Sequence, residues 1–211
     1  MKKIWLPIPT FINFLALCCI YGVIMVVNIT YFAHGTTPDN EQGLFSGQNS
    51  VQLSKLGVEQ MAGLPKLIKD KHFDVVFTSD LKRGIESAEL SFPGYKIIQD
   101  KRLRECDVGD LTGKKEPLVD EFVEKNGPNK KFPNGESLKD VEVRIKSLLN
   151  DLKKEYPGKS VAIIAHKYTQ LAIDVIVKKI SWEEAIAQDW RKKVPKAWKP
   201  GWDYIINTKY S

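Results

Sequence analysis

Two short apolar runs, far apart in the chain, each end at a histidine, and this pair constrains the fold more than any other feature. The first run crosses residues 28–33 and ends at His34, and Gly-Thr-Thr-Pro follows at once. The second run, residues 160–165, ends at His166. A short apolar run bounded by turn residues is typical of a buried strand. Because open α/β sheets bind ligands at the carboxyl ends of their parallel strands, we predict that the two imidazoles meet over one pocket.

Strands and helices are predicted to alternate through the rest of the chain. A first strand is expected from about Val26, and further strands at residues 73–77, 95–98 and 202–207. Ser54, Ser137 and Ser181 are expected to cap helices, and two more helices are expected at residues 81–90 and 169–178. Such alternation implies crossover connections, which place helices on both sides of a parallel sheet. The sequence therefore predicts an α/β fold: a three-layer sandwich with a mostly parallel central sheet and helices on both faces.

A polar segment, residues 107–133, interrupts this alternation. It carries Gly109 and Gly113 and a run rich in lysine and proline. We expect the segment to be an insertion or a lid over the pocket.

Length and composition place the chain among folded globular proteins. With 211 residues, 43% of them hydrophobic and 27% charged, one compact domain is expected. The net charge of +6 comes mostly from lysines spread along the chain, which favours a solvated surface and small anionic substrates over a nucleic-acid partner. The three cysteines and three histidines show no zinc-site spacing. We predict no metal, no other cofactor and no nucleic acid partner; the oligomeric state is left open.

The first 25 residues form a separate apolar segment ahead of the predicted domain, residues 26–211. Lys2 and Lys3 precede it, and residues 4–24 carry no charge. At 1.5 Å per residue such a helix would reach about 31 Å, enough to cross a hydrocarbon core. This interpretation predicts a signal anchor or transmembrane helix, membrane association through residues 4–25, and a domain held outside the cytoplasm.

The position of Met25 supports a second interpretation of the same segment. An anchor ending there would enter the predicted strand at Val26 with no linker. If translation begins at Met25, the preceding residues are an extension of the gene model, and the protein is soluble and cytoplasmic. Both interpretations remain open at this point.

Six short motifs then point to a known family. They are Ala33-His34-Gly35-Thr36-Thr37 with Asn40 and Gly43, Leu53-Ser54 with Gly57 and Gln60, Ser79 to Arg83 with Ser87-Ala88-Glu89, Leu103-Arg104-Glu105 with Gly109 and Gly113, Asn134 to Ser137, and Ala165-His166. In this order, they resemble the motifs of the histidine phosphatase superfamily. The resemblance covers roughly residues 26–178 and implies a phosphoglycerate-mutase-like fold.

The resemblance also implies a reaction and the residues for it. Transfer of a phosphoryl group needs a nucleophile, cationic or donor groups for the charged oxygens, and an acid for the leaving oxygen. The resemblance implies that His34 is the nucleophile that forms a phosphohistidine, Glu105 the proton donor, and His166 a third catalytic residue. The predicted phosphate-binding residues are Arg83, Asn40, Gly35, Thr37 and Lys167. The predicted partner is a small phosphorylated substrate.

One departure from the family's motifs bears directly on activity. The family has an arginine before the nucleophile, and this chain has Ala33. Losing one charge-assisted phosphate contact removes a few kcal/mol of transition-state stabilisation, on the order of a hundredfold in rate. Lys167 replaces a glycine of the family, and we consider that its ammonium supplies part of the missing charge. Three functions remain open: a phosphomonoester hydrolase, a phosphoglycerate mutase, and an inactive module that binds phosphorylated ligands.

Overall fold

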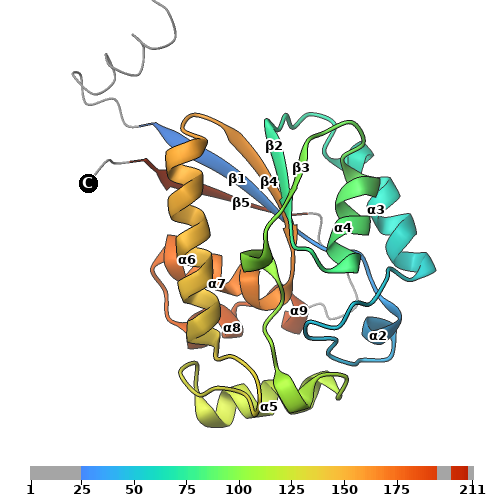
Figure 1. Ribbon diagram of the computed structural model, residues 1–211, viewed down its shortest axis with the longest axis vertical. Helices are drawn as coiled ribbons and strands as arrows, with labels where there is room; N and C mark the ends of the chain where they lie inside the picture. Colours follow the sequence, from blue (N-terminus) through green and yellow to red (C-terminus); the bar gives the residue numbers. More distant parts are fainter. Residues whose placement is uncertain (1–24, 194–200, 209–211) are drawn as a thin grey trace, which may run out of the picture.

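The computed structural model describes residues 25–193 and 201–208, and a five-stranded sheet runs through its centre (Figure 1). The strands are β1 (Val26–Ala33), β2 (Val75–Thr78), β3 (Ile97–Gln99), β4 (Ser160–Ala165) and β5 (Trp202–Asn207). Their order is β3-β2-β4-β1-β5. All the neighbouring pairs are parallel except β1 with β5. The predicted α/β class with a mostly parallel sheet is therefore confirmed.

Helices cover both faces of this sheet. The helices are α2 (Pro38–Glu41), α3 (Lys55–Leu67), α4 (Lys82–Ser91), α5 (Glu116–Asn126), α6 (Leu138–Glu155), α7 (Lys167–Lys178), α8 (Trp182–Ala187) and α9 (Trp190–Lys193). Helices α3 and α4 lie on one side of the sheet, and α6 and α7 lie on the other (Figure 1). The side chains of Ser54, Ser137 and Ser181 each accept a backbone N–H from three residues further on, which confirms the predicted caps.

The alternation of side chains along β1 and β4 explains why both faces are covered. Tyr31 and Ile163 belong to the apolar cluster on the α6 and α7 side. Phe32 and Ile164 belong to the cluster on the α3 and α4 side. Successive residues of a strand point to opposite faces, so a continuous apolar run needs a partner layer on each. The pairing of β1 with β4 sets Ala33 opposite Ala165, and the two strands end level.

Several predicted boundaries differ from the structure. The strands expected from residues 73 and 95 begin at Val75 and Ile97. Phe73 is buried ahead of β2, and the carboxylate of Asp74 accepts the backbone N–H of Ser160 and the ammonium of Lys159. An apolar pattern indicates which residues are buried, and here the first buried residue, Phe73, precedes the first residue of the strand, Val75.

Two further segments differ in their secondary structure. The helix expected from residue 169 begins at Lys167, because Thr169 Oγ1 accepts the backbone N–H of His166 and thereby caps α7 two residues earlier. The segment 107–133, expected to be an insertion or a lid, contains the helix α5, which was not predicted. That helix lies at the lower end of the molecule, beyond the carboxyl ends of the strands (Figure 1).

The predicted membrane anchor is corrected. Among the helices of residues 25–193 and 201–208, none is both long and apolar enough to cross a membrane. The longest of them, α6, has 18 residues, with six buried apolar side chains on one face and charged residues elsewhere. The transmembrane helix and the membrane-anchored localisation are therefore not retained. The segment that suggested them, residues 4–25, lies outside the described residues except for Met25.

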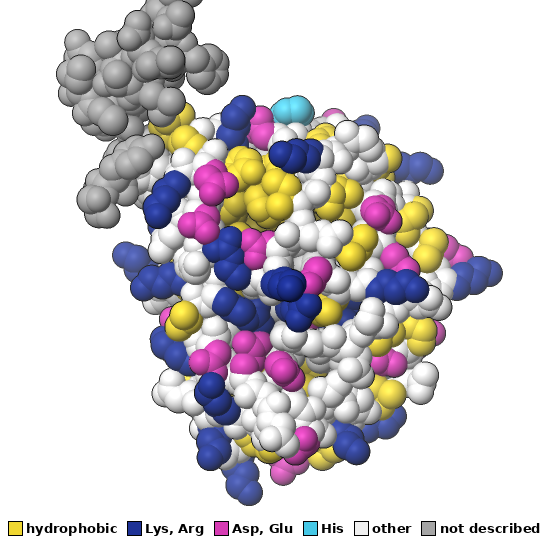
Figure 2. Space-filling view, viewed as in Figure 1, with side chains coloured by type: hydrophobic (Ala, Val, Ile, Leu, Met, Phe, Trp, Pro, Cys, Tyr) yellow, Lys and Arg dark blue, Asp and Glu magenta, His cyan; other side chains and the backbone are white. Residues whose placement is uncertain are grey.

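Charged side chains are mixed on the visible surface. In the view of Figure 2, lysine and arginine side chains lie scattered over the face and alternate with carboxylates. Ion pairs such as Lys71 with Asp203 and Lys159 with Asp74 contribute to this mixture. This distribution is typical of a solvated surface.

Candidate active site

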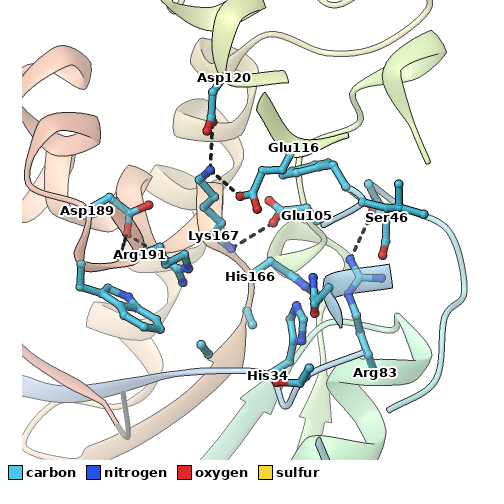
Figure 3. Close-up of a pocket in the computed structure, with 18 of the residues that line it drawn as sticks. His34, Ser46, Arg83, Glu105, Glu116, Asp120, His166, Lys167, Asp189 and Arg191 are labelled. Atoms are coloured by element: carbon cyan, nitrogen blue, oxygen red, sulfur yellow. Dashed lines mark hydrogen bonds and ion pairs between the residues drawn. The ribbon is translucent and has the colours of Figure 1, made fainter. Parts of the chain in front are cut away.

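His34 and His166 meet where β1 and β4 end, as the two apolar runs predict. The backbone N–H of His34 donates to the carbonyl of Ala165 at 3.0 Å, which keeps the two strand ends together. The two ring centroids lie 5.0 Å apart. Both residues line a cavity of about 490 Å³, and Figure 3 shows the rings facing it side by side. The rings are close enough for both to contact one small group bound in the cavity.

The imidazole of His34 is held in one tautomer. Its Nδ1 lies 2.7 Å from the carbonyl oxygen of Gly35. A carbonyl can only accept, so Nδ1 carries the proton and Nε2 keeps its lone pair. Burial, helped by the positive charge of Arg83, lowers the pKa of His34 to about 3. The ring is therefore neutral at pH 7, and its Nε2 is a competent nucleophile.

His166 is fully buried and is fixed from two sides. Its Nε2 lies 2.8 Å from the hydroxyl of Ser79, and its backbone carbonyl accepts the hydroxyl of Tyr31. Burial lowers the pKa of His166 well below its usual value, and Arg83 adds to the effect. Within the described residues, Nδ1 of His166 has no hydrogen-bond partner. Ser79 follows β2; the sequence analysis placed it in a family motif but did not assign it to the site.

Arg83 brings a buried positive charge to the same cavity. It stands in the first turn of α4 and is 2% exposed. Its guanidinium donates to the carbonyls of Asn49 (2.9 Å) and Gly47 (2.7 Å). None of the ion pairs in the described part of the chain involves Arg83. The charge of Arg83 is therefore held in place by neutral acceptors and stays available to an anion.

Glu105 follows the 3₁₀ turn at Lys101–Leu103, and its carboxylate contacts the first turn of α7. Its side chain accepts the backbone N–H groups of Cys106 (2.8 Å), Lys167 (3.0 Å) and Tyr168 (3.1 Å). It is 5% exposed and lines the cavity. Burial raises the pKa of Glu105 and outweighs the lowering by the backbone N–H groups of Cys106 and Tyr168 and by the charges of Arg83 and Arg191. A carboxyl group that holds its proton more tightly than usual suits an acid that must donate near neutral pH.

The loop after His34 uses three predicted phosphate-binding residues for its own structure. Thr37 and Asn40 form the capping box of α2. The Thr37 hydroxyl accepts the backbone N–H of Asn40, and Oδ1 of Asn40 accepts the backbone N–H and the hydroxyl of Thr37. The N–H of Gly35 donates to the hydroxyl of Ser87. Gly35 and Thr37 are not among the cavity-lining residues, whereas Asn40 is. The assignment of all three residues as phosphate-binding residues stays a prediction.

Lys167 points away from the histidines. Its ammonium lies 2.8 Å from Glu116 and 3.0 Å from Asp120, both on α5. Figure 3 shows its side chain extending toward these carboxylates. Two negative charges offset its single positive charge, so its contacts do not support the predicted substitution for the missing arginine at position 33.

Arg191 is a second arginine at the cavity that the sequence analysis did not identify. It lies on α9 and lines the cavity together with Asp189. Residues 190–202 mix tryptophans with basic side chains. No local pattern singles out one base among the five lysines and arginines of that stretch.

Among the described residues, no group of three or more His, Cys, Asp or Glu side chains could hold a metal ion.

Comparison with known proteins agrees with the fold and with the family resemblance. The family description "Histidine phosphatase superfamily (branch 1)" matches residues 31–197. A 2,3-bisphosphoglycerate-dependent phosphoglycerate mutase of Allorhizobium ampelinum is 28% identical over 204 residues, covering 88% of this chain and 95% of the relative. Phosphoserine phosphatase 1 of Hydrogenobacter thermophilus is 29% identical over 155 residues, covering 67% of this chain and 71% of the relative.

Solved structures give the same result for the fold. A mycobacterial glucosyl-3-phosphoglycerate phosphatase superposes with a TM-score of 0.66 at 23% identity, covering 77% of this chain and 84% of that one. A protein described as mycobacterial hydrolase 1 superposes with a TM-score of 0.69, also at 23% identity, over 77% of this chain and 86% of that one. The family match spans well over half of the sequence, and the chain therefore belongs to the histidine phosphatase superfamily, branch 1.

Proposed function

We propose that the protein hydrolyses small phosphomonoesters through a phosphohistidine on His34. The observation that carries this proposal is the convergence of four groups on one cavity: a neutral histidine with a free Nε2, a second histidine 5.0 Å away, a buried arginine and a buried carboxyl group. These are the nucleophile, the oxyanion donors and the acid that phosphoryl transfer needs.

The first step forms the covalent intermediate. Nε2 of His34 attacks phosphorus, and the bond from phosphorus to the ester oxygen breaks. Glu105, whose pKa is raised by burial, gives a proton to that leaving oxygen. Arg83 holds the equatorial oxygens, and Nδ1 of His166 donates to them in the tautomer in which the Ser79 hydroxyl donates to Nε2.

The second step returns the enzyme to its starting state. A water molecule attacks the phosphorus of the phosphohistidine, and the Glu105 carboxylate takes a proton from that water. The bond between phosphorus and Nε2 breaks, inorganic phosphate leaves, and His34 is neutral again. The same carboxyl group thus acts first as acid and then as base.

Hydrolysis of p-nitrophenyl phosphate tests this proposal. The wild type should release p-nitrophenol, and His34→Ala should abolish the release. His72→Ala is the matched control, because His72 is the third histidine of the chain and is exposed before β2. A quench in alkaline denaturant, which preserves the phosphorus–nitrogen bond, followed by mass spectrometry should place a phosphoryl group on His34. Turnover that survives His34→Ala would reject the proposal.

Two alternatives are separated by the same set of assays. A mutase is favoured by the similarity to a phosphoglycerate mutase over 88% of the chain; it would convert 3-phosphoglycerate to its 2-isomer, whereas a phosphatase releases glycerate and phosphate. An inactive binding module is favoured by Ala33. It would bind inorganic phosphate in a titration and show no turnover that depends on His34.

A further inference from the structure

Ala33 leaves one side of the histidine pair without the arginine that the family places there. Ala33 and Ala165 end their strands side by side and both line the cavity. A methyl group at position 33 supplies no charge. The phosphoryl site as built from Arg83 alone therefore has its fixed positive charge on one side only.

Arg191 stands on the other side. In Figure 3 the two histidines lie between Arg83 and Arg191, which approach from opposite sides of the cavity. Arg191 belongs to α9, which follows α7 and α8 in the chain. A phosphate group between the imidazoles would have a guanidinium on each flank.

The guanidinium of Arg191 is held by buried partners. Asp189, whose side chain is 1% exposed, accepts Nη1 of Arg191 at 2.9 Å and its backbone N–H at 3.1 Å. Gln170, also buried, accepts Nη2 at 3.1 Å. The guanidinium carbon lies 4.8 Å from the centre of the Trp190 ring. A cation fixed in this way loses little conformational entropy when an anion binds.

The remaining donors of Arg191 face no other acceptor in the described residues. Its side chain has five N–H groups, and Asp189 and Gln170 use two of them. The charge is felt across the site, because it lowers the pKa of both His34 and His166. The sequence suggested Lys167 as another cation at the cavity. Its ammonium forms ion pairs with two carboxylates of α5.

We propose that Arg191 is a phosphate-binding residue that supplies, from the carboxyl-terminal part of the chain, the second guanidinium clamp that Ala33 lacks. The inference rests on the proposed phosphatase function and assigns to Arg191 the phosphate contact that an arginine at position 33 would make. Asp189, Gln170 and Trp190 are positioning residues that hold this guanidinium.

Substitution of Arg191 tests the inference in a phosphatase assay. Arg191→Ala should lower kcat/KM for p-nitrophenyl phosphate by about a hundredfold, and Arg191→Lys should recover only part of the loss, because an ammonium cannot donate as a planar fork. In the Arg191→Ala background, Ala33→Arg should restore at least tenfold. Lys82→Ala removes the same charge from an exposed side chain outside the cavity and should change little.

Folding is controlled by a second variant. Arg191→Ala leaves the buried Asp189 carboxylate without its ion pair, which can destabilise the fold. The double variant Arg191→Ala/Asp189→Asn removes that orphaned charge. It should melt within a few degrees of the wild type and still show the loss of kcat/KM.

A direct binding measurement separates this inference from the proposed function. Titration of the protein with inorganic phosphate by calorimetry should show about tenfold weaker binding in the double variant than in the wild type. Suppose that turnover depends on His34, but that kcat/KM and phosphate affinity of the double variant Arg191→Ala/Asp189→Asn both stay within threefold of the wild type. The Arg191 inference is then overturned, and the phosphatase proposal stands. If no variant, wild type included, shows turnover, the phosphatase proposal fails and the titration alone decides the role of Arg191.

Discussion

The pairing of Lys167 with α5 predicts how the protein responds when that lysine is removed. The Lys167 side chain is 9% exposed, and its ammonium sits between Glu116 at 2.8 Å and Asp120 at 3.0 Å. Lys167→Met keeps most of the apolar stem and removes the charge. Two carboxylates then face the mouth of a cavity that must admit an anion. We expect weaker substrate binding and a looser attachment of α5.

The size of the effect follows from the charges and their exposure. At an effective dielectric constant of about 20, unit charges about 8 Å apart interact by about 2 kcal/mol, so one lost positive charge costs about 4 kcal/mol against a dianion. The carboxylates of Glu116 and Asp120 are 42% and 29% exposed. Solvent and salt therefore reduce this to about 1–2 kcal/mol, roughly a tenfold rise in KM. The free energy of unfolding should fall by about 1–2 kcal/mol, below the range for fully buried pairs.

Steady-state kinetics with p-nitrophenyl phosphate and urea unfolding measure both quantities. KM should rise about tenfold with kcat nearly unchanged, since the lost charge acts equally on the bound substrate and on the transition state. The triple variant Lys167→Met/Glu116→Gln/Asp120→Asn should restore KM. A fall in kcat of a hundredfold with KM unchanged would refute the reasoning, because it would mean that Lys167 contacts the phosphoryl group in the transition state and replaces the missing arginine after all.

Three further predictions concern His34, Ser79 and Glu105. Folding lowers the pKa of His34 from its ordinary 6.5 to about 3. Between these pH values the unfolded chain binds more protons than the folded protein, so the free energy of unfolding falls as the pH falls. His34→Asn should show a smaller loss of unfolding free energy between pH 7 and pH 5 in urea titrations. Ser79→Ala removes the partner of the buried His166 Nε2. It should lower kcat/KM about tenfold and lower the free energy of unfolding by about 1–3 kcal/mol. Ser79→Thr, which keeps the hydroxyl, should retain more activity if the hydrogen bond is what matters. The raised pKa of Glu105 predicts that kcat falls as the pH rises through that pKa, and Glu105→Gln should lower kcat and flatten this alkaline limb; an unchanged limb in that variant would assign it to another group.

The parts of the fold that local sequence specifies were predictable. β4 and β5 begin and end at the predicted residues 160–165 and 202–207, because each has a pattern that only one strand register satisfies. The edge strand β3 is short, and none of its three residues is buried. Its boundaries could not be read from burial. For the same reason α5, a helix with only two buried residues, was not predicted.

The candidate site divides in the same way. His34, His166, Arg83 and Glu105 each stand at the end of an element or in a helix's first turn, where short motifs identify them. The contacts that modify them come from distant positions: the hydroxyl of Ser79 reaches His166 across 87 positions of sequence. The orientation of Lys167 was equally hidden, because it depends on carboxylates 47 and 51 positions away. Only the packed structure brings these groups together.

The charges around the cavity couple phosphate binding to the proton on Glu105. Arg83 and Arg191 both lower the pKa of this carboxyl group, and burial raises it. A bound phosphate ester brings two negative charges between those arginines, offsets their effect and favours the protonated carboxyl. The pKa of Glu105 should therefore be higher in the substrate complex than in the free enzyme. Because kcat reports the complex and kcat/KM the free enzyme, the alkaline limb of kcat should lie at higher pH than that of kcat/KM. Coincident limbs would mean that the bound phosphoryl group does not share its electrostatic environment with Glu105, which would remove that residue from the role of proton donor.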